Sequence, residues 1–174
     1  MKRIAIDMDE VIADTLEKFI TVCNEELGLC LTKSDMTGRN FWDVVGKEHF
    51  SRLRGLVNEQ GFFADLEVMA DSQEVIRSLM ERYEVFISSA AMEVPTSFTA
   101  KFEWLKMHFP FIPASHIVFC GDKSILNADY LIDDNARHFE RFGGEGILYS
   151  APHNTLVEGY RRVQNWKEVE EIFR

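Results

Sequence analysis

Short runs of apolar residues recur along the chain, and most of them are apolar at nearly every position rather than at every second one. Runs of this kind are typical of strands in a parallel sheet that is covered on both faces. We predict five such strands: Arg3–Ile6, Val85–Ser88, Ile117–Cys120, Tyr130–Ile132 and Gly146–Tyr149.

The segments between these runs have apolar residues at helical spacing, or a length that suits a helix. Four of them are predicted as helices: Ser72–Tyr83, Ser97–His108, Asn135–Phe142 and Asn165–Phe173. Strands that alternate with helices predict an α/β protein with a Rossmann-like, doubly wound parallel sheet.

Residues 7–71 interrupt this alternation, because they contain no convincing strand. Asp14–Leu27 and Lys47–Glu59 have the pattern of amphipathic helices instead. We therefore expect a small helical cap, Thr15–Met69, inserted into a core of residues 1–14 and 70–174. No linker rich in Pro, Gly or Ser separates the two parts, so the cap is expected to sit tightly on the core.

The composition restricts the possible partners. The chain has 174 residues, 46% of them apolar, which is enough for one hydrophobic core. A net charge of −10 disfavours polymeric nucleic acid and anionic membranes as partners. Three cysteines cannot all pair within the chain, and the N-terminal segment resembles no signal peptide. We expect a cytoplasmic protein, a monomer or a homodimer, that acts on a small molecule.

Two pairs of aspartates follow two of the predicted strands. Asp7 and Asp9 follow the first strand, and Asp133 and Asp134 follow the strand that begins at Tyr130. In an open α/β sheet the ligand crevice lies beyond the carboxyl ends of the strands. One carboxylate of such a pair can attack phosphorus while the other handles a proton, and clustered carboxylates suit Mg²⁺. A solvated acidic loop is the alternative for either pair taken alone.

Two further strand ends carry groups that could hold a phosphate. Ser88 and Ser89 offer hydroxyl groups, and Lys123 offers a cation after the strand Ile117–Cys120. Neither feature is specific alone, since serines end many strands and most lysines are solvated. The order along the chain is more informative: a carboxylate nucleophile, a hydroxyl, a lysine and an acidic pair, each at its own strand end.

This order resembles the four motifs of the haloacid dehalogenase superfamily of phosphatases. Its first motif, an apolar strand that ends in DxD, is matched by IAIDMDEVIAD at Ile4–Asp14. The second, third and fourth motifs are matched by Ser89, by Lys123 and by the pair Asp133 and Asp134.

Within the superfamily the chain is most similar to the 5′(3′)-deoxyribonucleotidases. DMDEVIAD resembles their DMDGVLAD, and NFWDV at Asn40–Val44 and GFFADLE at Gly61–Glu67 resemble segments of their cap. KFEWLKMHF, GDKSIL and ADYLIDD resemble later stretches. The resemblance covers most of the chain up to Asp134 and is weaker through Gly143–Arg174.

The resemblance implies a role for each matching residue. Asp7 would be the nucleophile, and Asp9 the general acid that later acts as a base. Ser89 and Lys123 would hold the phosphoryl oxygens. The implied magnesium ligands are Asp7, the backbone carbonyl of Asp9 and Asp134, and the cap aromatics Phe41 and Trp42 would stack on a nucleobase, unless they only pack in the core.

Several residues depart from the family pattern. Glu10 stands where the family has Gly, and Thr15 stands where an aromatic residue of the base pocket is expected. Ala90-Ala91 replaces Ser-Pro, and Gly121 replaces an Arg. All of these affect substrate recognition, so two hypotheses follow: a 5′(3′)-deoxyribonucleotidase, or a phosphatase of the same mechanism that acts on another small phosphorylated metabolite.

Other activities receive less support from the sequence. Dehalogenases of the superfamily lack the second aspartate, which Asp9 supplies here. A phosphomutase shares the motifs and stays open as an alternative. A silent binding protein would be expected to have lost a catalytic residue, and this chain has them all.

Overall fold

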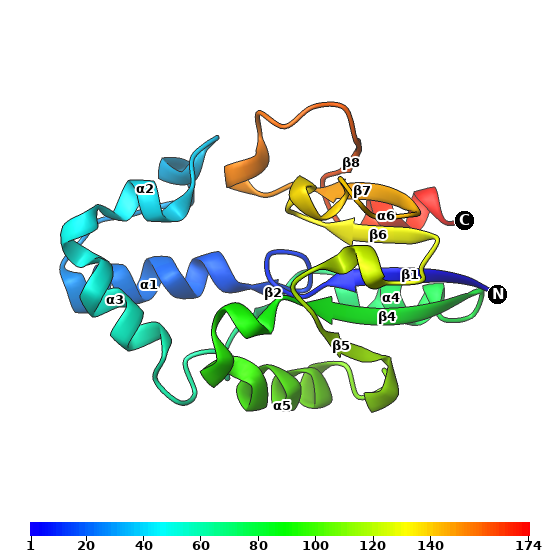
Figure 1. Ribbon diagram of the computed structural model, residues 1–174, viewed down its shortest axis with the longest axis horizontal. Coiled ribbons are helices and arrows are strands. Elements are labelled where there is room, and N and C mark those ends of the chain that lie inside the picture. The colour runs from blue at the N-terminus through cyan, green and yellow to red at the C-terminus, as the bar shows by residue number, and fades with distance from the viewer.

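The centre of the molecule is a six-stranded parallel sheet, seen in a computed structural model that describes residues 1–174 (Figure 1). The strand order is β5-β4-β1-β6-β7-β8. The strands are β1 (Lys2–Asp7), β4 (Tyr83–Ser89), β5 (Ile117–Phe119), β6 (Tyr130–Asp133), β7 (Glu145–Tyr149) and β8 (Arg161–Val163). The first strand of the chain therefore lies inside the sheet, between β4 and β6.

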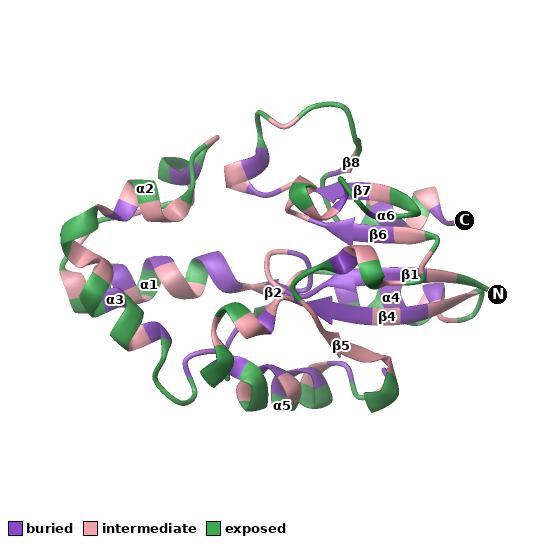
Figure 2. Ribbon diagram, in the orientation of Figure 1, coloured by how far each residue is buried: buried purple, intermediate pink, exposed green.

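The two faces of the sheet are covered differently. Alternate residues of β1 point to opposite faces, and Ile4 and Ile6 join a large core with the helices α4 (Ser72–Leu79), α5 (Phe98–His108) and α6 (Trp166–Ile172). Ala5 belongs to a smaller cluster that also contains Leu131, Leu148, Phe139 and Phe142. Figure 2 shows long buried stretches in β1, β4, β6 and β7, whereas the edge strand β5 is only intermediately buried. The doubly wound α/β fold is confirmed.

The predicted helix Asn135–Phe142 is wrong. This segment contains only a 3₁₀ turn at Ala136–His138, and beyond it Phe139 and Phe142 are buried against the smaller face of the sheet. The close approach depends on Gly146 of β7, where a Cβ atom would lie 2.4 Å from the ring of Phe139. Two aromatic side chains thus cover the strands directly, and no helix is needed there.

The other differences concern the ends of elements and three missed strands, which are β8 and the two-residue strands β2 (Ala13–Asp14) and β3 (Glu67–Val68). The helix predicted for Ser72–Tyr83 ends at Leu79, because Tyr83 already pairs with Lys2 as the first residue of β4. The short strand β8 carries two arginines and gives no apolar run, so the pattern did not predict it. The other five predicted strands are present, with shifts of one or two residues at their ends.

Residues 15–69, which we call the cap, hold the helices α1 (Thr15–Leu27), α2 (Phe41–Val45) and α3 (Phe50–Val57). The division of the chain into this cap and a core stays a prediction from the sequence. Figure 1 shows these helices beyond the carboxyl ends of the strands. Asp14 caps α1 by accepting a hydrogen bond from the amide of Glu17, and Gly28, with φ of 66°, ends this helix.

Hydrogen bonds between backbone groups join the cap to the core in two places. Where the chain enters and leaves the cap, β2 (Ala13–Asp14) and β3 (Glu67–Val68) form a short antiparallel ribbon. Away from the ribbon, the amide of Gly38 donates a hydrogen bond to the carbonyl of Pro152, 2.9 Å away. Phe62 and Phe63 are buried in the same cluster as the central strand.

None of the helices combines the length and the apolar character that a membrane crossing requires.

Candidate active site

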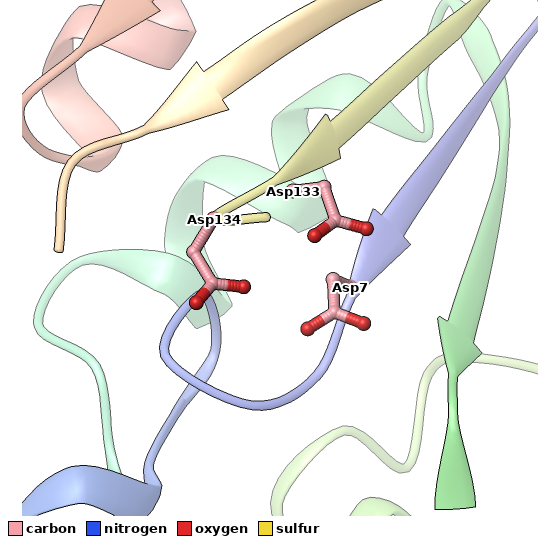
Figure 3. A group of neighbouring side chains, drawn as sticks. All are labelled: Asp7, Asp133 and Asp134. Atoms are coloured by element: carbon pink, nitrogen blue, oxygen red, sulfur yellow. The ribbon is translucent and has the colours of Figure 1, made fainter. Parts of the chain in front are cut away.

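Three aspartates meet at the carboxyl edge of the sheet. β1 ends at Asp7 and its neighbour β6 ends at Asp133, which Asp134 follows. One carboxylate oxygen from each residue lies within 4.8 Å of the others. Figure 3 shows the three side chains around one common space beyond the two strand ends. The structure thus brings Asp7 of the first acidic pair together with both aspartates of the second pair, whereas Asp9 is not part of this group.

Lys123 connects two of these carboxylates. Its side chain is fully buried, and its ammonium donates to Asp7 Oδ1 and, over 2.6 Å, to Asp133 Oδ2. The second oxygen of Asp133 accepts a hydrogen bond from the amide of Asn135, 2.9 Å away. Asp133 therefore has a protein donor on each oxygen, whereas Asp7 has Oδ2 free of any protein donor.

Asp134 is less constrained. Its carboxylate has one neighbour of opposite type, His153, whose Nε2 lies 3.3 Å from Oδ2. No lysine, arginine or backbone amide donates to this carboxylate. Of the two aspartates that follow β6, Asp134 is thus the one whose oxygens remain available to an ion, while those of Asp133 are occupied by Lys123 and Asn135.

The electrostatics of the cluster favour a bound cation. The pKa of Asp7 is raised to about 7, mainly by burial; Lys123 opposes this shift, and the nearby Asp133 and Asp9 add to it. Burial also raises the pKa of Asp134 well above its usual range, with Asp133 and Asp7 adding to the effect. Ionising all of these neighbouring carboxylates costs electrostatic free energy, because only one ammonium lies between them. A bound divalent cation would offset this repulsion.

Asp9 belongs to a second group of contacts. Lys101 of α5 donates to Asp9 Oδ2 over 2.5 Å, and the hydroxyl of Thr15 donates to Asp9 Oδ1 over 2.7 Å. Ser89 joins this group through a contact of 3.4 Å between its Oγ and the ammonium of Lys101. Burial opposes ionisation of Asp9, but Lys101 and the hydroxyl of Thr15 outweigh it and lower the pKa of this carboxyl.

Lys101 was missed in the sequence, although a signal for it exists. It lies four residues after Ser97 and three before Trp104, and all three side chains are buried on one face of α5. A lysine on the buried face of a helix requires a partner of opposite charge. Such a partner could have been sought at the acidic strand ends.

Glu10 adds a further carboxylate beside Asp9. Its backbone is left-handed, with φ of 61°, where glycine is favoured and where the family pattern has glycine. Its Oε1 accepts a hydrogen bond of 2.5 Å from the amide of Leu16, at the start of α1. Burial raises the pKa of Glu10 to about 8. Glu10 thus connects the loop after β1 to the first turn of the cap.

A cavity of about 280 Å³ lies between the cap and the carboxylates. Phe41 and Trp42 both line it and contact each other edge to face, with ring centroids 5.7 Å apart. Thr15, which stands where the family pattern has an aromatic residue, lines it too. Phe19, one turn later in α1, adds an aromatic ring to the lining. The remaining lining residues are Asp9, Glu10, Leu16, Met36, Asn40, Asp134, Asn135 and His153. Asp7, Ser89 and Lys123 do not line it and lie deeper.

The loop that carries His153 is fixed by a buried asparagine. Asn154 donates to the carbonyls of Asp134 and Tyr149, each over 2.8 Å, and accepts from Arg162 of β8 over 2.8 Å. Arg162 also donates to the carbonyl of Val157. The part of the chain with the weaker resemblance therefore holds the backbone of Asp134 in place. Nothing in the sequence pattern indicated this network.

Comparisons with known proteins agree with this geometry. The family model described as 5′ nucleotidase, deoxy (pyrimidine), cytosolic type C protein matches residues 1–174. The chain belongs to this 5′ nucleotidase family. The resemblance stated from the sequence is confirmed, including the segment after Gly143 where it was weaker.

Relatives of the 5′ nucleotidase family align over nearly the whole chain. The 5′(3′)-deoxyribonucleotidase of Bacillus subtilis is 39% identical over 171 residues, which is 97% of this chain and 96% of the relative. A Staphylococcus aureus protein (strain Mu50) that is provisionally named a 5′(3′)-deoxyribonucleotidase is 46% identical and covers 99% of this chain and 95% of its own.

Solved structures of other proteins have the same fold as this chain. A haloacid dehalogenase-like protein of Agrobacterium tumefaciens has a TM-score of 0.63 at 11% identity, over 99% of this chain and 97% of that one. The hydrolase YfnB of Bacillus subtilis, solved with magnesium, has a TM-score of 0.61 at 12% identity over 99% and 98%. At this identity the likeness shows the haloacid dehalogenase-like fold.

Proposed function

We propose that this protein hydrolyses phosphomonoesters through an aspartyl-phosphate on Asp7, with Mg²⁺, and that its substrates are deoxyribonucleoside monophosphates. The observation that carries the proposal is the position of Asp7. Its carboxylate ends the central strand, with Oδ1 bound by Lys123 and Oδ2 free of protein donors. Hydrolase activity on phosphate esters is also what the membership of a 5′ nucleotidase family supports.

In the first step a carboxylate oxygen of Asp7 forms a bond to phosphorus, and the bond from phosphorus to the ester oxygen breaks. The electron pair stays on the departing alcohol oxygen, which takes a proton from Asp9. In the second step a water oxygen attacks phosphorus, Asp9 accepts the proton of the water, and the bond to Asp7 breaks. Ser89 and Lys123 hold phosphoryl oxygens, where charge accumulates in the transition state.

The residues present fit a magnesium site. The oxygens of Asp7 and Asp134 and the backbone carbonyl of Asp9 are hard ligands. The free oxygen of Asp7 and Oδ1 of Asp134 have no protein donor, and Oδ2 of Asp134 has only His153 as a neighbour, 3.3 Å away. When bound, the ion would neutralise phosphate charge and hold the phosphate against Asp7. Asp133 serves instead to fix Lys123, since both of its oxygens are occupied.

The cavity supports a nucleoside as the leaving group. The aromatic side chains of Phe41, Trp42 and Phe19 present faces and edges for a base, and Asn40 and Asn135 add amide groups that can hydrogen-bond to a sugar or base. The relatives named 5′(3′)-deoxyribonucleotidases support the same class of substrate.

The proposal is tested by phosphate release from dUMP and dTMP and from their 3′ isomers, with Mg²⁺ or with EDTA. We expect turnover that requires the metal, and the Asp7→Asn variant should lose it by more than about 1000-fold because the nucleophile is gone. Turnover retained in Asp7→Asn would contradict covalent catalysis. An efficiency on all four nucleotides no better than on para-nitrophenyl phosphate would contradict the substrate assignment.

A second candidate is a phosphatase of the same mechanism that acts on another small phosphorylated metabolite. Thr15 and Gly121 favour it, because both positions lack the larger side chain that the family pattern has there, and Glu10 adds a carboxylate to the cavity. Sugar, amino-acid and nucleoside phosphates assayed side by side separate the two candidates by their kcat/KM values.

A further inference from the structure

Only two lysines of the chain are buried, Lys123 and Lys101. The mechanism above gives Lys123 a task and leaves Lys101 without one. An ammonium loses much hydration free energy when it is buried, so its contacts have to be strong. Lys101 is 4% exposed, and its polar contacts are Asp9 and Ser89, with the ring of Phe63 4.8 Å from its Nζ.

The contacts of Asp9 come from two separate parts of the molecule. Thr15 is the first residue of the cap helix α1 and binds Oδ1, and Lys101 of the core helix α5 binds Oδ2. A carboxylate oxygen can accept two hydrogen bonds. Both oxygens of Asp9 are therefore held, and each still has a lone pair for a water molecule.

We propose that Lys101 and Thr15 are positioning residues that together fix the carboxylate of Asp9. In the fixed orientation Asp9 can accept a proton from the attacking water in the second half of the reaction. The proposal rests on the proposed function, since it concerns hydrolysis of the phosphate ester on Asp7. In that step the water oxygen bonds to phosphorus, its proton passes to Asp9, and the bond between phosphorus and Asp7 breaks.

This step depends on the orientation of the Asp9 carboxylate. A base that receives a proton from water works only when its lone pair is aimed at that water, and a misplacement of about 1 Å can cost about 100-fold in rate. Free rotation about the side-chain bonds of Asp9 would produce such errors. Two donors, one on each oxygen, remove that rotation.

The test compares Lys101→Met with Lys106→Met, which removes an exposed lysine from the same helix. Substrate is para-nitrophenyl phosphate with Mg²⁺, because its phenolate leaves without needing a proton. For Lys101→Met we expect kcat to fall about 10- to 100-fold, while kcat/KM, which reports formation of the phosphoenzyme, changes less than about 3-fold. The acid-quenched phosphoenzyme fraction should rise. Lys106→Met should match the wild type in all three.

Thr15 supplies an independent pair of variants that keep the shape of the side chain. Thr15→Val removes the hydroxyl and should show the same pattern as Lys101→Met to a smaller extent, and Thr15→Ser should restore most of kcat. Far-ultraviolet circular dichroism and the unfolding temperature check that all variants fold.

Two results would overturn the positioning role. The first is a phosphoenzyme fraction in Lys101→Met no higher than in the wild type. The second is an equal fall of kcat and kcat/KM, which would place Lys101 in phosphate binding instead. Turnover that persists in Asp7→Asn would overturn the proposed function itself, so the two failures are distinguishable.

Discussion

Asp7 and Asp9 are two residues apart, yet each is held by a different lysine. Lys123 binds Asp7 from the loop after β5, and Lys101 binds Asp9 from α5. In the proposed mechanism, separate cations would allow one carboxylate to act as a nucleophile while the other keeps its orientation for proton transfer. The proposed roles of the two carboxylates would then depend on partners that lie far away in the chain.

Glu10 makes the stability of the protein depend on pH. Its pKa is about 8 in the folded protein, against an ordinary value of 4.5. Between these values the folded state keeps a proton that the unfolded state has released, so the free energy of unfolding falls as pH rises. In EDTA, the Glu10→Gln variant should therefore gain stability relative to the wild type between about pH 5 and about pH 8.

Urea unfolding at a series of pH values measures this difference. Glu25→Gln, which changes an exposed glutamate of α1, is the matched control and should follow the wild type. Parallel curves for Glu10→Gln and the wild type would show that the folded protein does not keep this proton.

At the scale of elements, the face of the sheet that carries the smaller hydrophobic cluster is the least conventional part of the fold. Phe139 and Phe142 cover it from a segment that holds only a 3₁₀ turn, and Gly146 of β7 lies directly under the ring of Phe139. The helical pattern of Asn135–Phe142 is therefore misleading, because the spacing of its two phenylalanines suits a turn packed flat on strands as well as a helix.

The packing under Phe139 predicts the effect of one methyl group. Gly146→Ala should lower the free energy of unfolding by about 1–3 kcal/mol, because the added carbon overlaps the aromatic ring and forces it away from the sheet. Gly143→Ala is the control, since nothing lies within 4 Å of the atom it adds. Equal unfolding midpoints in urea for the two variants would contradict this packing.

The loop after β7 depends on one buried side chain. Asn154 is 1% exposed and ties the carbonyls of Asp134 and Tyr149 to Arg162. Asn154→Ala leaves these buried groups unpaired, so we expect a loss of about 2–4 kcal/mol in the free energy of unfolding and a weaker Mg²⁺ affinity through a displaced Asp134. Both are measured by calorimetry, with Arg161→Met on the exposed side of β8 as the control. An unchanged Mg²⁺ affinity would separate this network from the site.

At the scale of the whole molecule, the acidic cluster connects metal binding to stability. Mg²⁺ should raise the unfolding temperature, because it relieves the repulsion among Asp7, Asp133 and Asp134; at a concentration of about 100 times Kd the gain is about 2.7 kcal/mol. Asp134→Asn should be more stable than the wild type in EDTA and should lose most of the response to Mg²⁺. A full response in that variant would remove Asp134 from the metal ligands.

The sequence predicted the architecture because strands buried on both faces have a clear signature, and it located the acidic edge because parallel strands end together. It did not reveal Lys101 or Asn154 as part of the site. Their partners, Asp9 and Asp134, lie 92 and 20 residues away in the chain, and only the folded structure brings each pair into contact. Residues that contact the substrate can be recognised by sequence motifs. Residues that position those side chains are recognised by their burial in the folded structure.

The central position of β1 also has a consequence for how the enzyme assembles. The strand is synthesised before the other strands of the sheet, and its partners β4 and β6 begin 81 and 128 residues after its first residue. Such distant pairings close large loops and form slowly. Asp7 therefore acquires Lys123 and Asp134 only when most of the chain is in place. During refolding from urea, turnover should return with the last phase of the fluorescence change and never ahead of it. Catalytic activity would then report the completion of folding.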